Sequence, residues 1–375
     1  MKTYEDQIRS LVFPRMLAVA LLALLLGVFA PKSLADGRSG AVYTLSNQST
    51  GNSVIVFRRS SDGTLSLVDS FPTGGNGVGT GPDPLASQGA VTLNQSNQLL
   101  FAVNAGSNEV SVFGVDGDNL HLLDKMSSRG TMPVSIAVHG SLVYVLNAGG
   151  TPNIAGFTFD QRTKHLVPLQ GSERNLTGSS SANPAEVSFS LDGDILMVTE
   201  KGTQTIDTYI VNHDGYASGP ISNHSSGSTP FGFEFTHRSV VVVSEAGTNA
   251  LSSYVANESG NLELVTGTLT NGQSAVCWAI VTNDGRYAYS VNSGSSTISS
   301  YAVSPEGILT LLDPAATTTG GAPVDPALSR DSRFFYVRDG GQNVVHGFRV
   351  EANGSLTPIG TIGGIPAGSQ GLAAR

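Results

Sequence analysis

Apolar and polar positions along the chain alternate in short runs that return as the same phrase seven times. Each copy has an apolar run, then Asn, Glu or Asp, a Gly-rich turn, a β-branched run and an aromatic residue. Such short alternating runs predict strands, and no long 3.6-residue period occurs after residue 35. The copies are LSNQSTGNSVIVF (45–57), AVNAGSNEVSVF (102–113), VLNAGGTPNIAGF (145–157), VTEKGTQTIDTY (198–209), VSEAGTNALSSY (243–254), SVNSGSSTISSY (290–301) and VRDGGQNVVHGF (337–348).

The spacing of the copies indicates the architecture. They recur about every 45–50 residues, which is typical of a β-propeller whose repeat is one sheet. The sequence therefore predicts an all-β, seven-bladed β-propeller of four-stranded antiparallel blades. In the fourth unit we expect strands at 186–190, 195–199 and 206–211, and a short fourth strand after Gly215.

Asx-Gly pairs between the apolar runs support these divisions. They predict tight hairpin turns. Both central residues of such a turn need positive φ, and Asn, Asp and Gly adopt it most readily. The pairs are Asp62-Gly63, Asp116-Gly117, Asp192-Gly193, Asp214-Gly215, Asp284-Gly285 and Asn353-Gly354. The main insertion, GGNGVGTGPDP (74–84), predicts a mobile loop.

The two ends of the repeat array complement each other. The first unit begins at 41–45 with a strand of the second type and lacks a first strand. The final phrase SQGLAAR (369–375) resembles SQGAVTL (87–93), which begins the second unit. We therefore expect the C-terminal strand to pair with the N-terminal blade and close the ring, which removes open sheet edges.

The N-terminal segment has the pattern of a signal peptide. Basic residues precede an apolar run at 16–30, and small residues lead up to Ala35. We expect a signal peptide at 1–35, a single propeller domain at 36–375, and a secreted or periplasmic protein without a membrane span after cleavage. The alternative is an uncleaved membrane anchor.

Charge and composition narrow the class of partner. The formal net charge is −9, which argues against nucleic acid because phosphates require a basic face. The single cysteine, Cys277, cannot form an internal disulfide. The seven histidines show no metal-ligand spacing, and no phosphate-binding loop or nucleophile elbow occurs. We expect no metal, no cofactor and a monomer.

The repeated turn places polar residues on one face of the predicted ring. Turns between second and third strands share a face with the starts of first strands, so their side chains converge around the channel. Asn and Asp there also have a structural interpretation, since both bond nearby backbone. The predicted ligand-binding residues are Asn104, Asn147, Asn292, Asp325, Asp339 and Trp278. The predicted catalytic residues are Glu245, Glu186 and Glu200. Glu200 and Glu245 replace the small residue of the repeated turn, where Glu is a poor turn former, and Glu186 lies near the start of a first strand.

Two units, NPAEVSFSLDGDILMVTEKGTQTIDTY (183–209) and VTNDGRYAYSVNSGSSTISSY (281–301), carry a family resemblance. They resemble the seven-bladed lactonase family, which includes a type of 6-phosphogluconolactonase and carboxy-cis,cis-muconate cyclase. The resemblance implies a site that uses His, Arg and Glu on the channel face. The phrases here read 183–186 NPAE, 228–232 STPFG and Ser244-Glu245, so only the carboxylate is retained.

Two functions therefore remain open. The first is an exported propeller with a polar, acidic channel-face pocket that binds a small molecule, a cation or a partner protein without catalysis. The alternative is a lactone-hydrolysing or ring-closing enzyme that uses Glu245 with Glu186 or Glu200. Two carboxylates held close can divide acid and base roles between them.

Overall fold

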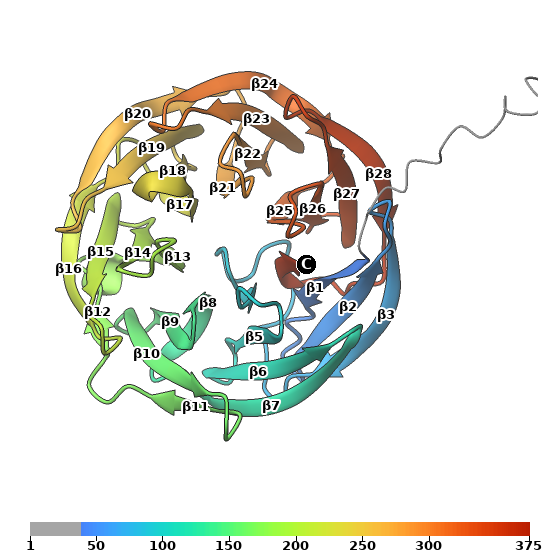
Figure 1. Cartoon of the computed structure of the whole chain (residues 1–375). Helices are drawn as coiled ribbons and strands as arrows, with labels where there is room; N and C mark the ends of the chain where they lie inside the picture. The colour runs from blue at the N-terminus through green and yellow to red at the C-terminus, as the bar shows by residue number, and fades with distance from the viewer. Residues whose placement is uncertain (1–38) are drawn as a thin grey trace, which may run out of the picture. The chain divides into compact units, whose positions relative to one another are not determined.

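Seven antiparallel sheets are arranged around a central axis (Figure 1). The computed structural model describes residues 39–375, and the predicted signal peptide lies outside the described residues. Six sheets have four strands, and the third gains a fifth because β12 pairs with β10. Within this range the only helices are two short 3-10 turns, η2 (Ser179–Ser181) and η3 (His237–Ser239). The prediction of an all-β, seven-bladed propeller is confirmed.

The strands of each blade are called a to d from the axis outward. Blade 1 contains β29 (Gln370–Ala374), β1 (Gly40–Leu45), β2 (Ser53–Arg59) and β3 (Leu65–Pro72). Blade 2 contains β4 (Val91–Leu93), β5 (Leu99–Asn104), β6 (Glu109–Asp116) and β7 (Asn119–Ser127). Blade 3 contains β8 (Thr131–His139), β9 (Leu142–Gly149), β10 (Asn153–Asp160), β11 (His165–Pro168) and β12 (Arg174–Asn175).

The other four blades follow the same order. Blade 4 contains β13 (Pro184–Phe189), β14 (Ile195–Glu200), β15 (Thr205–Val211) and β16 (Ala217–His224). Blade 5 contains β17 (Pro230–Phe235), β18 (Val240–Glu245), β19 (Ala250–Ala256) and β20 (Leu262–Thr270). Blade 6 contains β21 (Val276–Val281), β22 (Tyr287–Asn292), β23 (Thr297–Val303) and β24 (Leu309–Thr318). Blade 7 contains β25 (Pro323–Leu328), β26 (Phe334–Asp339), β27 (Val344–Val350) and β28 (Leu356–Ile362).

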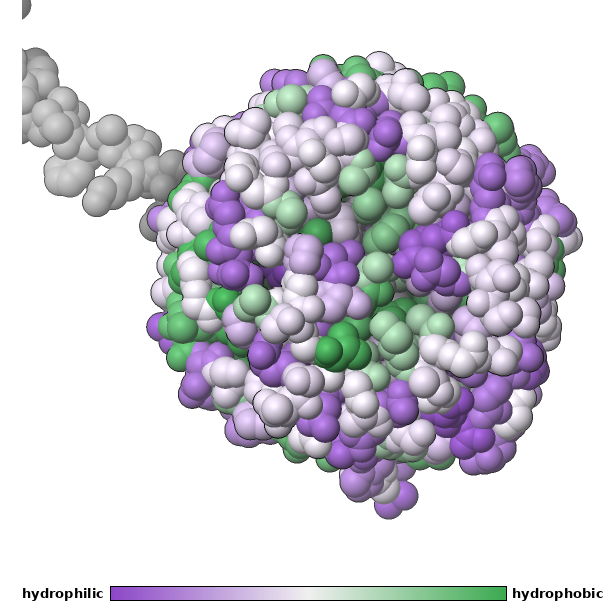
Figure 2. Space-filling view, turned by 180° about the vertical axis from the view of Figure 1, so that it is seen from behind, coloured by the Kyte–Doolittle hydropathy of each residue, from purple (hydrophilic) through white to green (hydrophobic). Residues whose placement is uncertain are grey.

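Burial decreases from the b strands to the rim. The b strands β14, β18 and β26 are buried at all six positions, because neighbouring blades cover both faces of each sheet. The d strands, such as β20, are mostly exposed or half-buried. Figure 2 shows apolar side chains near the middle of one face, with polar side chains around them.

Tyrosines on b strands tie some neighbouring blades together. Each donates its hydroxyl to the carbonyl of the turn glycine between strands c and d of the next blade. Such a buried phenol is satisfied only when the next blade is in place. The pairs are Tyr144 to Gly215 (2.8 Å), Tyr289 to Gly354 (2.9 Å) and Tyr336 to Gly63 (2.7 Å).

The Asx-Gly turns occur where predicted, with one difference in backbone geometry. Gly193 and Gly285 have φ of 84° and 70°, whereas Asp192 and Asp284 are not left-handed. The Gly193 amide donates to the carbonyl of Ser190 at 2.9 Å, within a loop of four residues. Loops of this length are commonly built on type I turns, whose two central residues have negative φ, so only the glycine that follows them is left-handed.

The strand bounds of blade 4 differ modestly from those predicted. The a strand begins two residues earlier than expected, at Pro184. The d strand, β16, has eight residues and is not the short strand that the sequence suggested. Its exposed residues have little apolar periodicity, which is why its length was underestimated.

The C-terminal strand closes the ring as predicted. β29 pairs antiparallel with β1, with Tyr43 opposite Ala373 and Val42 opposite Ala374. The Thr44 hydroxyl donates to the carbonyl of Gly371 at 2.7 Å. The first blade therefore takes its a strand from the far end of the chain (Figure 1).

Candidate functional site

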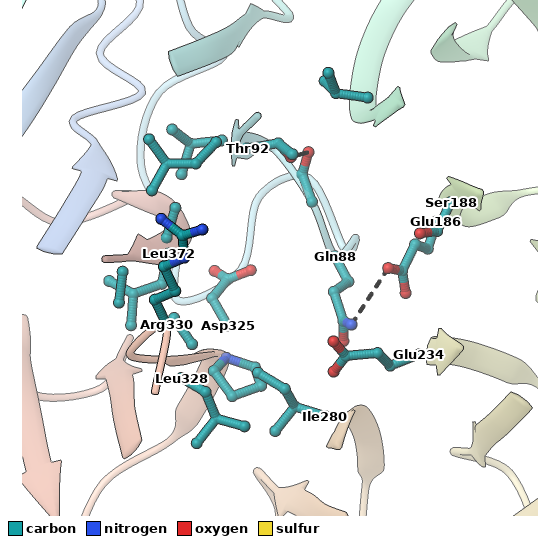
Figure 3. Close-up of a pocket in the computed structure, with 18 of the residues that line it drawn as sticks. Gln88, Thr92, Glu186, Ser188, Glu234, Ile280, Asp325, Leu328, Arg330 and Leu372 are labelled. Carbon is teal, nitrogen blue, oxygen red and sulfur yellow. Dashed lines mark hydrogen bonds between the residues drawn. The ribbon is translucent and has the colours of Figure 1, made fainter. Parts of the chain in front are cut away.

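A cavity of about 500 Å³ lies at the axis, between the a strands of several blades (Figure 3). Its mouth is formed by turns between strands a and b, which supply Asn97, Asn283 and Arg330. We call the end of the propeller that carries these turns the AB face. The opposite end carries the b–c turns and is called the BC face. The cavity therefore opens on the face opposite to the one that the sequence analysis favoured.

Residues 82–88 cross the axis and close the BC end of this cavity. We call this segment the axial plug. It is the chain in the middle of Figure 1 that leads into blade 2. The Trp278 indole donates to the Ser87 carbonyl at 3.0 Å, and the Ser87 hydroxyl donates to the Val134 carbonyl at 2.9 Å.

The insertion that precedes the plug is also held in place. The amides of Gly77 and Gly79 donate to the carbonyls of Gln48 and Asn47 at 2.8 and 3.0 Å. Residues 74–84 therefore form an ordered path over the BC face, and the prediction of a mobile loop did not foresee these bonds. The main-chain contacts are made by glycine amides, which the composition of the segment alone does not reveal.

Two glutamates from neighbouring blades face the cavity, Glu186, which is buried, and Glu234, which is half-buried. One Glu186 carboxylate oxygen, Oε2, accepts from the Phe233 amide at 2.7 Å, and Glu234 Oε2 accepts from the Val281 amide at 2.7 Å. Burial raises the pKa of Glu186 well above its usual range, and the charge of Glu234 adds to this shift. Burial also raises the pKa of Glu234 to about 7. Among the described residues, neither carboxyl group forms an ion pair.

The raised pKa of Glu234 predicts a pH-dependent effect of Glu234→Gln on stability. A carboxyl group whose pKa rises on folding stabilises the fold below its ordinary pKa, and this contribution is lost as pH rises through about 7. We expect Glu234→Gln to increase the free energy of unfolding by about 2 kcal/mol at about pH 8 relative to wild type, and to change it little at about pH 5. Urea denaturation at both pH values measures this difference. An equal effect at both values would contradict the assigned burial.

Asp325 supplies a third carboxylate. It forms a fully buried ion pair with Arg338 at 3.2 Å, and Asp325 Oδ2 also accepts from the Gln370 side chain and the Gly371 amide. Its other oxygen, Oδ1, is buried without a hydrogen-bond partner within the described chain. Burial raises the pKa of Asp325, and Arg338 counters this shift. Asp325 therefore carries an unused acceptor within the wall of the cavity.

The acidic residues of the repeated b–c turns have a different role in the structure. Glu200 accepts from the Gly178 amide at 3.0 Å, and Glu245 accepts from the Gly227 amide at 2.7 Å. Asp339 accepts from the Ala322 amide at 3.0 Å. Each acid thus binds the loop that leads into its own blade, and each is completely buried. These three residues do not line the axial cavity, whereas Glu186 does.

The predicted asparagines occupy equivalent positions and bond the same kind of loop. Asn104 accepts from the Thr73 hydroxyl at 2.6 Å, and Asn147 donates to the Ser128 carbonyl at 3.1 Å. Asn292 accepts from Asn271 at 3.2 Å. All three are buried and none lines the axial cavity. Their ligand-binding role therefore stays a prediction, and it does not concern the axial cavity.

Trp278 packs between blades and against the plug. It is 2% exposed, and its ring lies 5.0 Å from that of Phe231. Lys201 lies 4.9 Å from the Phe231 ring centroid and donates to the Ala86 carbonyl of the plug. Burial lowers the pKa of Lys201 to about 8 and raises that of Cys277 to about 12. Trp278 thus anchors the plug rather than lining the cavity.

Gln88 and Glu234 line the cavity but were not among the site residues predicted from the sequence. Glu234 is the one acid inside the apolar run Phe233-Glu234-Phe235 of an a strand, and this interruption was a usable signal. Gln88 had no such signal, because the course of the axial plug across the channel, which the local sequence does not show, places it in the cavity. No group of three or more His, Cys, Asp or Glu is placed to hold a metal anywhere in residues 39–375.

Comparisons with known proteins agree with this architecture. Residues 39–174 match the lactonase family of seven-bladed β-propellers, so the resemblance predicted from the sequence is confirmed over that part of the chain. None of the curated proteins matches the chain. No helix within the described part of the chain is long and apolar enough to span a membrane.

Solved structures show the same fold at low sequence identity. A periplasmic gluconolactonase from Pseudomonas aeruginosa is 15% identical, with a TM-score of 0.67 over 89% of this chain and 99% of that one. A Bacteroides uniformis protein provisionally assigned as a 6-phosphogluconolactonase is 18% identical, with a TM-score of 0.71 over 88% and 99%. A Lactobacillus plantarum protein is 17% identical, with a TM-score of 0.71 over 90% and 98%.

Proposed function

We propose, with the lactonase-family match of residues 39–174 as the premise, that the axial cavity binds a small, neutral, hydroxyl-rich ring such as a sugar lactone. The observation that carries the proposal is a set of buried acceptors without donors. Asp325 Oδ1 and Gln88 Oε1 both lack partners in the described chain, and both residues line the cavity. A buried acceptor left unpaired costs about 1–3 kcal/mol, which a ligand hydroxyl would recover.

The charge of the cavity favours a neutral ligand. The pKa of Glu234, about 7, leaves this group partly protonated near neutrality, and burial favours the protonated form of Glu186 by raising its pKa. A protonated carboxyl can donate to a ring or carbonyl oxygen. Asp325 is balanced by Arg338. An anion would meet the carboxyl groups, with Arg330 at the mouth as the one basic side chain among the lining residues. A hydroxylated ring uses both the acceptors and the protonated carboxyls.

Equilibrium binding tests this proposal. Anhydroglucitol has the hydroxylated ring and cannot be hydrolysed, so its affinity can be measured by isothermal titration calorimetry. We expect wild type to bind it and Glu234→Gln to bind about tenfold more weakly at about pH 8, because the charged acceptor is lost. Glu263→Gln on the exposed strand β20 is the matched control and should bind as wild type. Absence of binding to wild type would refute the proposal.

Hydrolysis of the lactone is a second candidate function, favoured by one feature of Glu234. Its Oε1 has no hydrogen-bond partner in the described chain, and its pKa of about 7 suits a general base. As base, Glu234 would take a proton from the water that attacks the lactone carbonyl, and would return it to the ring oxygen as the bond between that oxygen and the carbonyl carbon breaks. In a pH-stat assay with gluconolactone, turnover should rise through about pH 7 and be lost in Glu234→Gln. Turnover that depends on Glu245 instead would favour the family site predicted from the sequence.

The location of the protein is part of the proposal. The apolar segment at 16–30 and the periplasmic gluconolactonase among the similar structures support export of a mature domain beginning at residue 36. We propose that this domain acts as a secreted or periplasmic monomer. N-terminal sequencing of the exported protein and its size-exclusion mass test these two points.

A further inference from the structure

Gln88 is the one side chain of the axial plug that reaches across the cavity to three other blades. Its Nε2 donates to the Ala279 carbonyl at 3.0 Å, the Phe233 carbonyl at 3.3 Å and Glu186 Oε1 at 3.3 Å. Figure 3 shows Gln88 extending between Glu186 and Glu234. Because two carbonyls can only accept, the amide nitrogen must face them, and the direction of Oε1 is thereby fixed.

The Gln88 oxygen is buried, and it has no donor among the described residues. It lies against Gly232, where a Cβ would sit 2.2 Å from Oε1. The equivalent positions of blades 4 and 6 carry Glu186 and Trp278, so most side chains there would displace this oxygen. The absence of a side chain at Gly232 therefore leaves room for a fixed acceptor in the wall of the cavity, on a residue that lines it.

We propose that Gln88 is the specificity-determining residue of the cavity and that its Oε1 accepts a hydrogen bond from a ligand hydroxyl. This inference rests on the proposed function and deepens it. The plug that carries Gln88 also closes the BC end, so the ligand enters and leaves through the AB face alone. Selectivity for hydroxylated over bare rings then depends on one residue of the plug.

The test compares Gln88→Met with wild type in binding to anhydroglucitol and to tetrahydropyran, the same ring without hydroxyls. Met has a similar length but accepts hydrogen bonds poorly. We expect a 10–30-fold loss of affinity for anhydroglucitol, which corresponds to one lost hydrogen bond, and an equal loss of selectivity. Gln161→Met, on the exposed turn after β10, is the control and should match wild type.

A second variant and a fluorescence measurement separate specificity from folding. Trp278 is the single tryptophan and bonds the plug, so the emission maximum of the free protein reports on its position. Gly232→Ala leaves the plug sequence intact and should weaken anhydroglucitol binding by a similar factor. If both variants keep the wild-type emission and bind as wild type, the inference is overturned while the proposed function stands. If wild type binds no anhydroglucitol, both are overturned.

Discussion

Deletion of residues 370–375 is expected to abolish cooperative folding of the propeller. The deletion removes the whole of β29 and so leaves β1 with an open edge at the axis. It exposes the apolar neighbours of Leu372 and removes the partners of Asp325, namely Gln370 and the Gly371 amide. An open sheet edge, a new apolar surface and unpaired buried polar groups together should cost at least about 5 kcal/mol, comparable with the total stability of a domain.

Thermal unfolding by circular dichroism, with size-exclusion chromatography, measures this effect. A point variant avoids the change in length: Leu372→Asp places a charge at a position that is 8% exposed. The control is Leu67→Asp on the rim strand β3, where the side chain is 50% exposed and the same change should be nearly neutral. A truncated chain that remains monomeric with a wild-type melting temperature would contradict the ring closure.

The second large effect is expected from Asp325→Ala. This change leaves Arg338 fully buried without its ion-pair partner, and the remaining acid nearby, Asp83, forms no ion pair with the guanidinium. Removing one partner of a buried ion pair typically destabilises the fold by about 3–5 kcal/mol, because the remaining charge is left buried without water or its ion-pair partner. The Arg338 Nη1 already lacks a partner in the described chain, so after the change the guanidinium keeps only the bond from Nη2 to the Pro82 carbonyl of the plug.

The free energy of unfolding from urea titration measures the effect of Asp325→Ala. The matched control is Asp118→Ala, which removes the half-buried partner of the exposed Arg58 and should cost at most about 1 kcal/mol. Arg338→Met together with Asp325→Ala should recover part of the loss, since the buried guanidinium charge is then removed as well. Equal costs for the two aspartate substitutions would contradict the assigned role of the Asp325–Arg338 pair.

The fold was predictable because its signals are local and repeated. The b strands are fully buried, so each copy shows the same apolar run, and the turn glycines mark where strands c and d meet. The similarity of 369–375 to 87–93 identified the closing strand, since both segments form or lead into an a strand. The d strand β16 was misjudged because exposed strands lack an apolar alternation.

The candidate site was only partly predictable, for a physical reason. The cavity is assembled by contacts across the axis, and the Gln88–Ala279 bond joins residues 191 positions apart. Glu186 was correctly placed near the start of an a strand and does line the cavity. Its catalytic role remains a prediction, and the structure brings it beside Glu234 rather than beside Glu200 or Glu245.

At the polar position that ends each b strand, the residue type alone did not distinguish a ligand-binding role from a structural one. A Glu, an Asp or an Asn at the end of a b strand can bind the amides and hydroxyls of the preceding loop. Gly227 leaves the required space, since a Cβ there would lie 2.0 Å from the Glu245 carboxylate. The glycines in these loops were therefore the better indicator of the role of the acids.

We place the ligand site in the acidic cavity that opens at the AB face. A crystal structure of residues 36–375 soaked with anhydroglucitol tests this placement. We expect the ring between Gln88, Glu234 and Asp325, with hydroxyls on the two acceptors that lack donors among the described residues. A ring bound instead on the BC face, beside Lys201 and the b–c turns, would contradict it.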